Sequence, residues 1–208
     1  MFNLKFGETY IPNLLGKTKS YTLNIVNGDN LNIIGDSGAG KSSYINKLIG
    51  LPSIIKGDIF LDNNNFKNFN HSDWCQVRRK IFSLVKQDLG LFDHLNVKEN
   101  IFIFNNLENS IPKSTDNDII FNLGLENILP QKISSLSIGE KQRVAICRSL
   151  VKPFELLILD EPFSHLDKEN KAKASSLIQK TADEENASII ITSLGEDHSF
   201  NNLELLQL

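Results

Sequence analysis

A glycine-rich stretch at residues 35–42, GDSGAGKS, constrains this chain more than any other part of its sequence. It matches the pattern G-x-x-x-x-G-K-[ST], follows the apolar run LNIIG and opens a helical pattern. Its glycines let the backbone wrap closely around phosphate groups, so that successive N–H groups point at them. Lys41 is then placed to reach the β- and γ-phosphates of a nucleotide, and the Ser42 hydroxyl to bind Mg²⁺. The predicted phosphate-binding residues are Gly35, Asp36, Ser37, Gly38, Ala39, Gly40, Lys41 and Ser42.

Three short, dense apolar runs predict strands that are buried on both faces, as in a parallel sheet. They lie at residues 31–35, 155–160 and 188–192. Helical patterns separate them at 41–48, 140–150 and 168–184. Alternation of strands and helices predicts an α/β fold.

Three other segments lie outside this alternating pattern of buried strands and helices. The first ten residues alternate apolar and polar side chains, which predicts a strand. The asparagine-rich run at 63–70 predicts a surface loop. Residues 88–136 have no convincing buried strand and predict short helices joined by loops, which we interpret as a small helical subdomain inserted into the core.

Two carboxylates follow the apolar run at 155–160, in the stretch ELLILDEP. Ligands bind beyond the carboxyl ends of the strands in open α/β sheets, which is where Asp160 and Glu161 are expected. Asp160 can hold Mg²⁺, commonly through a water molecule, and Glu161 can orient and polarise an attacking water.

A second candidate phosphate site lies about a hundred residues after the first, in LSIGEKQR at 136–143. Ser137 and Gly139 precede or open a predicted helix, whose N–H groups and dipole favour an anion. A serine cap on an ordinary surface helix is the alternative interpretation of this stretch alone.

The composition excludes several classes of protein. The net charge of −3 gives no reason to expect a nucleic-acid partner. Cys75 and Cys147 have no metal-binding spacing and read as reduced packing thiols. The N-terminus lacks the pattern of a signal peptide, and no apolar run approaches the roughly 20 residues that span a bilayer. We therefore expect a soluble protein whose membrane association depends on partners.

The order of the three motifs over nearly the whole chain resembles the nucleotide-binding ATPase subunits of ABC (ATP-binding cassette) proteins. The resemblance implies a single domain over residues 1–208, with a RecA-like core at about 1–87 and 137–208 and a helical subdomain at about 88–136. The implied core has a mainly parallel sheet, with an antiparallel β part near the N-terminus. It also implies head-to-tail dimers around two ATP molecules with Mg²⁺, in which each ATP contacts one subunit's P-loop and the other subunit's signature helix.

By resemblance, Ser137 and Gly139 would contact the γ-phosphate bound to the partner subunit. Asp167, in SHLD, would lie near the dimer interface and position the partner's catalytic elements. Gln87, in LVKQD, matches the glutamine that contacts Mg²⁺ and the water region. Tyr10 is the best candidate for the aromatic residue that stacks on adenine, with Phe6 as its rival.

The sequence departs from the family pattern at three positions. Ile138 and Glu140 replace the first glycine and the glutamine of the usual signature L-S-G-G-Q, whereas Gly139 is kept. Ser193 follows Thr192 where the family has a histidine that contacts the γ-phosphate. His198 lies five residues further on and is expected not to reach this site. Serine is shorter and carries no positive charge at neutral pH, so slow hydrolysis is expected unless Ser193 and a water molecule do the same work.

The stretches DEPFSHLD and DLGLFDHLNVKENI resemble bacterial importer ATPases. This branch implies a cytoplasmic protein, peripheral on the inner face of the membrane, whose residues 87–101 contact integral membrane permease subunits. Whether the dimer is a homodimer or a heterodimer stays open. The alternatives are a slow ABC-type ATP switch and an ATPase resembling those of lipoprotein release or cell division. A P-loop GTPase or kinase is disfavoured, because it has no use for LSIGEKQR and no base-reading NKxD occurs in a suitable place.

Overall fold

The computed structural model describes residues 3–10, 20–108, 115–195, 200–201 and 203–208. A parallel sheet forms the centre of the molecule, with the strand order β6-β7-β8-β3-β9. Its strands are Phe82–Val85 (β6), Leu156–Asp160 (β7), Ser188–Ser193 (β8), Asn30–Ile34 (β3) and Leu203–Gln207 (β9). The three apolar runs of the sequence thus form β3, β7 and β8, whereas β6 and β9 have no counterpart among the predicted strands.

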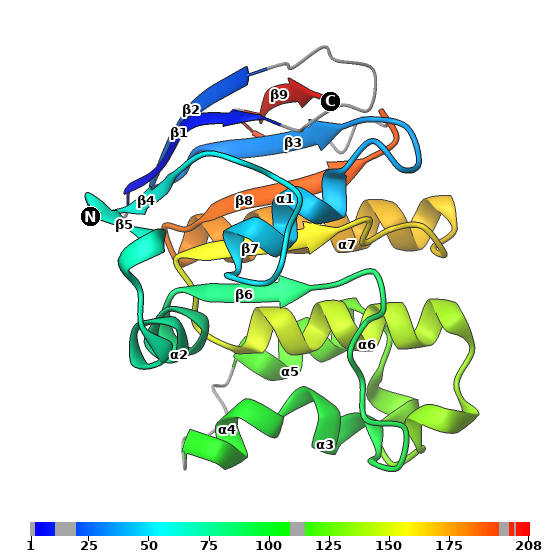
Figure 1. Cartoon of the computed structure of the whole chain (residues 1–208). Coiled ribbons are helices and arrows are strands. Elements are labelled where there is room, and N and C mark those ends of the chain that lie inside the picture. Colours follow the sequence, from blue (N-terminus) through cyan, green and yellow to red (C-terminus); the bar gives the residue numbers. More distant parts are fainter. Residues whose placement is uncertain (1–2, 11–19, 109–114, 196–199, 202) are drawn as a thin grey trace.

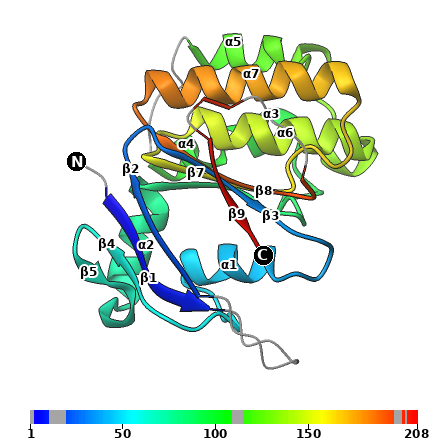
Figure 2. The same cartoon turned by 90° about the horizontal axis from the view of Figure 1, so that it is seen from above.

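Helices cover both faces of the parallel sheet (Figure 2). Helix α1 (Lys41–Leu48) lies on one face, and α6 (Ile138–Val151) and α7 (Lys168–Glu184) on the other. Alternate residues of β7 divide between the two cores: Leu156 and Ile158 pack on the side of α1, and Leu157 and Leu159 on the side of α6 and α7. This burial on both faces is the reason that β7 reads as a continuous apolar run.

A second, antiparallel sheet lies beyond α1 with the order β2-β1-β4-β5. It consists of Asn3–Tyr10 (β1), Ser20–Val26 (β2), Ile59–Leu61 (β4) and Asn64–Asn65 (β5). Figure 1 shows how these strands curve over the parallel sheet. The predicted α/β fold, with a mainly parallel sheet and an antiparallel part near the N-terminus, is confirmed.

The surface loop predicted at 63–70 is wrong in part. The segment contains β5 and a 3₁₀ helix, Phe66–Asn68 (η1), and the Phe66 side chain is buried. Phe66 packs with Phe69 and with Trp74, which belongs to α2 (His71–Lys80). The asparagines satisfy turn geometry as expected, but the two phenylalanines between them anchor the segment to the core.

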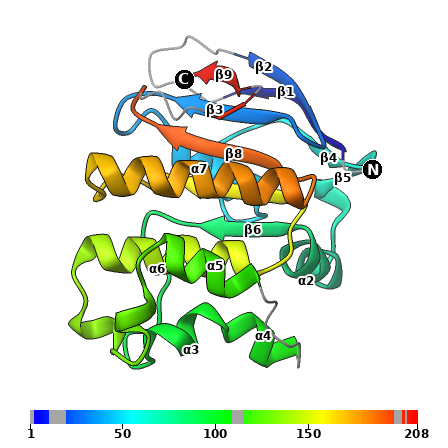
Figure 3. The same cartoon turned by 180° about the vertical axis from the view of Figure 1, so that it is seen from behind.

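Helices follow β6 along the chain, as the sequence predicts. They are Val97–Ile101 (α3), Ile103–Glu108 (α4) and Thr115–Asn122 (α5), with 3₁₀ turns at Glu126–Ile128 (η2) and Ile133–Ser135 (η3). Figure 3 shows α3, α4 and α5 packed around α6, below the parallel sheet. The core and subdomain limits at 87 and 137 stay a prediction. Among the described helices, none is long and apolar enough to cross a membrane.

Candidate functional site

The loop between β3 and α1 has the geometry that a phosphate-binding loop requires. Gly40 caps α1 with a left-handed backbone (φ 103°), which a glycine adopts without strain. A Cβ atom at Gly35 would lie only 2.9 Å from the Cβ atom of Ala39, so a larger residue would force the loop open. Asp36 closes the turn by accepting a hydrogen bond from the Ala39 N–H at 3.1 Å.

The ammonium group of Lys41 lies inside this loop. Its Nζ atom donates to the carbonyl oxygens of Gly35 at 2.7 Å and Asp36 at 3.2 Å. It also forms an ion pair with Oε1 of Glu161 at 3.1 Å, although the side chain of Lys41 is only 5% exposed. The predicted phosphate ligand and the predicted base therefore neutralise each other in this structure.

One threonine fixes both acids at the end of β7. The Thr192 hydroxyl, on β8, donates to Oδ1 of buried Asp160 at 2.7 Å and accepts from the Glu161 N–H at 3.0 Å. Glu161 has a left-handed backbone (φ 49°), which is uncommon for a residue other than glycine. This role of Thr192 cannot be predicted from the sequence, in which the residue shows only its place at the end of an apolar strand.

The Ser193 side chain is buried at the end of β8. Its hydroxyl donates to Oδ1 of buried Asn32 at 3.0 Å and accepts from the Gly195 N–H at 3.3 Å, and the side chain is 5% exposed. A cavity of about 440 Å³ lies beside it, with Glu161 in its lining. To contact a phosphate, the hydroxyl would first have to leave Asn32. His198 lies outside the described residues.

The LSIGEKQR stretch forms the start of α6, with Ser137 as its N-cap. The Ser137 hydroxyl donates to Oε2 of Glu140 at 2.6 Å and accepts from the Glu140 N–H at 3.3 Å. These contacts lower the pKa of the Glu140 carboxyl, because hydrogen bonds from the Ser137 hydroxyl and N–H stabilise its ionised form. Ile138 is 55% exposed, so its side chain does not cover the helix start.

Gly139 packs closely against a neighbouring loop. A Cβ atom at this position would lie 3.1 Å from the carbonyl oxygen of His165, in the loop after β7. The beginning of α6 is therefore in close contact with the segment that follows Glu161.

The remaining predicted residues occupy three separate places. Gln87 is exposed in the turn after β6. Asp167 caps α7 and accepts hydrogen bonds from the N–H and the side-chain amide of Asn170, each at 2.8 Å, and these bonds lower its pKa. Tyr10 is the last residue of β1, but its side chain and that of Phe6 lie outside the described set, so the adenine contact stays a prediction.

The P-loop contacts the Glu161 carboxylate through the side chain of Lys41, whereas the start of α6 contacts the backbone of the loop that follows β7. Lys41, Glu161, Asp160 and Thr192 meet at the carboxyl ends of β3, β7 and β8. Helix α6 lies below β6 in Figures 1 and 3, and Figure 2 shows it on the face of the parallel sheet opposite to α1.

Comparison with known proteins identifies relatives along most of the chain. Residues 18–164 match the family model described as ABC transporter. The chain is 32% identical over 191 residues to the thiamine import ATP-binding protein ThiQ of Haemophilus influenzae, a match that covers 88% of this chain and 86% of ThiQ. It is 30% identical over 174 residues to the lipoprotein-releasing system ATP-binding protein LolD of Wigglesworthia glossinidia brevipalpis, covering 82% and 76%.

Two solved structures of the ATP-binding cassette MJ0796 have the same fold. The dimeric structure of this bacterial ABC transporter cassette matches with a TM-score of 0.78 and 24% identity, covering 100% of this chain and 94% of that one. The dimeric post-hydrolysis state of MJ0796 bound to ADP and Pi matches with a TM-score of 0.75 and 25% identity, covering 93% and 88%. The sequence matches extend over more than two thirds of this chain and of each relative. The chain therefore belongs to the ABC transporter family.

Proposed function

We propose that this protein is the ATP-binding and ATP-hydrolysing subunit of an ABC transporter and that it works as a dimer. The main support for this proposal is that the protein's two phosphate-binding helix ends, at the starts of α1 and α6, lie in different parts of the fold. The P-loop leads from β3 into α1, whereas Ser137 and Gly139 begin α6, which lies on the opposite face of the parallel sheet. A head-to-tail partner gives the second helix end a use, because it can meet the nucleotide that the first subunit holds. The dimeric MJ0796 cassette supports such an assembly.

The chemistry that the site supports is hydrolysis of the γ-phosphate. An incoming phosphate competes with Glu161 for Lys41, which is paired to it at 3.1 Å. Glu161, once released, is free to accept a proton from the water that attacks the γ-phosphorus. The bond to the β-phosphate oxygen breaks, and ADP and inorganic phosphate leave. The predicted neighbours in this reaction are Gln87, Ser193 and, from the partner subunit, Ser137, Gly139 and Asp167.

The oxygen groups near the P-loop fit a magnesium ion carried in with ATP. Mg²⁺ prefers oxygen ligands and few protein ones. Ser42, in the first turn of α1, would hold the ion through its hydroxyl, and Asp160 through its carboxylate, which Thr192 holds in place. Gln87, exposed in the turn after β6, stays a predicted third ligand. No group of three or more His, Cys, Asp or Glu side chains forms a separate metal site within the described ranges. The ion supplies charge neutralisation at the phosphates when it is bound.

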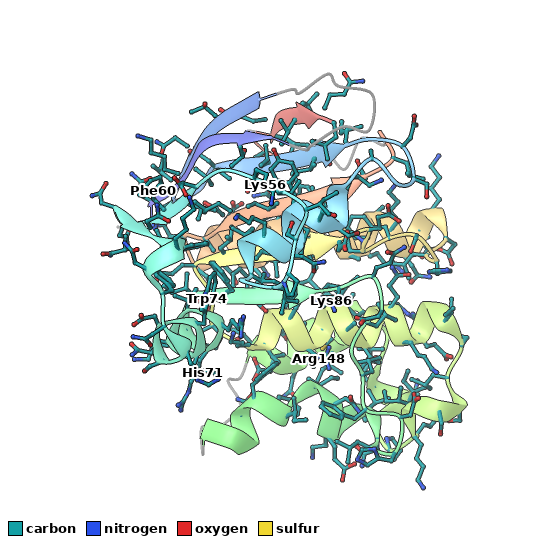
Figure 4. All side chains as sticks on the ribbon, viewed as in Figure 1. Lys56, Phe60, His71, Trp74, Lys86 and Arg148 are labelled. Atoms are coloured by element: carbon teal, nitrogen blue, oxygen red, sulfur yellow. The ribbon has the colours of Figure 1, made fainter. Side chains whose placement is uncertain are left out.

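An importer is the form of transporter that we favour, because the chain is similar to ThiQ, a thiamine import ATP-binding protein. A groove of about 500 Å³ next to Gln87 supports contact with permease subunits. Leu89 and Phe92, from the predicted contact segment 87–101, line it together with Phe104. Phe92 and Phe104 are 44% and 40% exposed, although both are large and apolar. Lys86 and Arg148, labelled in Figure 4, lie along the same groove. Such a contact would hold the protein at the cytoplasmic face of the membrane.

Two other roles have specific support. The buried hydroxyl of Ser193 favours a slow ATP switch, since a catalytic contact to the γ-phosphate is then missing. The similarity to LolD favours a role in lipoprotein release. The rate of ATP hydrolysis with and without permease subunits separates a switch from a transport ATPase.

Lys41→Ala tests the assignment of the P-loop. Loss of the ammonium group removes the charge that holds the phosphates, so we expect nucleotide affinity to fall at least about tenfold and turnover to become undetectable. Titration with a fluorescent ATP analogue measures the first, and release of inorganic phosphate the second. Lys47→Ala, in the last turn of the same helix, is the matched control. ATPase activity of Lys41→Ala equal to that of the wild type would refute the assignment.

A further inference from the structure

A buried glutamine on α6 contacts the loop that carries the proposed base. Gln142 lies five residues after Ser137 and is 1% exposed. A helix rises about 1.5 Å per residue, so Gln142 lies about 7.5 Å along α6 from the proposed contact with the partner's nucleotide. Buried polar side chains are costly unless they are hydrogen-bonded, so the partners of this amide define its role.

The amide of Gln142 bridges the loop from Glu161 to His165. Its Nε2 group donates to the Glu161 carbonyl oxygen and to the Ser164 hydroxyl, each at 3.3 Å. Its Oε1 atom accepts from the His165 N–H at 3.0 Å. One side chain therefore uses both of its amide hydrogens and its oxygen on a single turn of the chain.

These contacts complete the support of the Glu161 backbone. Thr192 accepts from the N–H of Glu161, and Gln142 donates to its carbonyl oxygen. Glu161 has a left-handed backbone, a conformation that persists only where the surroundings determine it. The direction in which the Glu161 carboxylate leaves the main chain thus depends on β8 from one side and on α6 from the other.

The same turn of α6 also packs tightly on this loop. The His165 carbonyl oxygen lies so close to Gly139 that a Cβ atom there would be 3.1 Å away. The tight contact at Gly139 and the three hydrogen bonds of Gln142 connect the first turns of α6 to the segment 161–165, so they offer a path by which movement of α6 would reach it.

We propose that Gln142 is a positioning residue for Glu161, through which the start of α6 controls the geometry of the base in its own subunit. This inference rests on the proposed function, because it takes Glu161 as the base and Ser137 as the contact to the second nucleotide. The two ATP sites of a dimer would then be coupled within each subunit by one side chain.

Gln142→Met tests the proposal, because methionine keeps the length of the side chain and removes all three hydrogen bonds. We expect kcat for ATP hydrolysis to fall about 10- to 100-fold, as for a catalytic group misplaced by about 1 Å, with ATP affinity changed less than twofold. Gln76→Met, at an exposed site on α2, is the matched control and should keep wild-type turnover. If Gln142→Met lowers thermal stability too far for assay, Gln142→Glu at pH 8 keeps the acceptor for His165 and removes both donors.

Combination with Glu161→Gln distinguishes positioning from a general structural effect. If Gln142 acts through the Glu161 carboxylate, Gln142→Met should change the residual single-turnover rate of Glu161→Gln less than twofold. An equal loss in both backgrounds, or full turnover of Gln142→Met, would overturn the inference while the proposed function stands. A wild-type protein that neither binds nor hydrolyses ATP would overturn both.

Discussion

At the scale of single residues, the site holds its charges in balance. Lys41 is buried among carbonyl oxygens and reaches Glu161, so the loop has no uncompensated ammonium group. Burial of an unpaired charge is costly, and this pair avoids that cost. In the proposed reaction, this ion pair would keep Glu161 engaged until a phosphate takes its place.

Ser193 allows a test of whether this site lacks a contact to the γ-phosphate. Its hydroxyl is bonded to Asn32, so it supplies no free contact to the γ-phosphate. Ser193→His offers an imidazole that the cavity beside Glu161 can accept, and we expect kcat at saturating ATP to rise about tenfold or more. Leu194→His, which adds the same group one residue further on, should give no gain. An unchanged rate in Ser193→His would show that this site does not need the histidine.

Some residues of the candidate site can be predicted from the sequence and others cannot. Lys41, Asp160 and Glu161 can be predicted, because their chemistry depends on neighbours in the sequence, a loop before a helix and acids after a strand. Thr192 and Gln142 act on residues that lie 31 and 19 positions away. Such contacts depend on strand order and helix placement, which local sequence patterns do not specify.

At the scale of elements, α6 links several functional segments. Its first turn includes Gly139, packed on the His165 carbonyl, and its last turn carries Arg148. The Arg148 guanidinium donates to the carbonyl oxygens of Leu89 at 2.6 Å and Gly90 at 2.8 Å. Both residues have left-handed backbones, so Arg148 holds a tight turn just after Gln87.

Arg148→Met should therefore destabilise the protein. The substitution leaves two carbonyl oxygens without their charged donor, and we expect a loss of about 3 kcal/mol in the free energy of unfolding. Urea denaturation measures this loss. Lys98→Met, at an exposed site on α3, should change it by no more than about 0.5 kcal/mol. A loss below about 1 kcal/mol for Arg148→Met would contradict the role of the guanidinium.

The elements that could be predicted from the sequence are those whose apolar residues are continuous or regularly spaced, or those that adjoin a recognisable motif. Helix α7 matches its predicted limits, and β7 and β8 agree to within a residue, because their apolar residues are continuous or regularly spaced. The sequence does not predict helix α2 or strand β6, and it places Phe66 in a loop. Phe66 packs against Trp74 of α2, and β6 is an edge strand of the parallel sheet. No local sequence pattern encodes either contact.

In the molecule as a whole, the two phosphate-binding helix ends belong to helices on opposite faces of the parallel sheet. The P-loop leads from β3 into α1 on one face of the parallel sheet, and α6 packs on the opposite face (Figure 2). A monomer therefore holds half of each proposed site. In the dimer that we propose, ATP would bridge the two subunits by binding both halves of a site.

Glu161→Gln tests this claim most directly. The change keeps the shape of the side chain, removes the base and removes the ion pair that occupies Lys41, so ATP should bind without being hydrolysed. Sedimentation analysis with saturating ATP and Mg²⁺ should show a species of twice 23.4 kDa, absent when Lys41→Ala is added to the same chain. A Glu161→Gln protein that stays at 23.4 kDa in saturating ATP while hydrolysing it at the wild-type rate would contradict both the dimer and the role of Glu161.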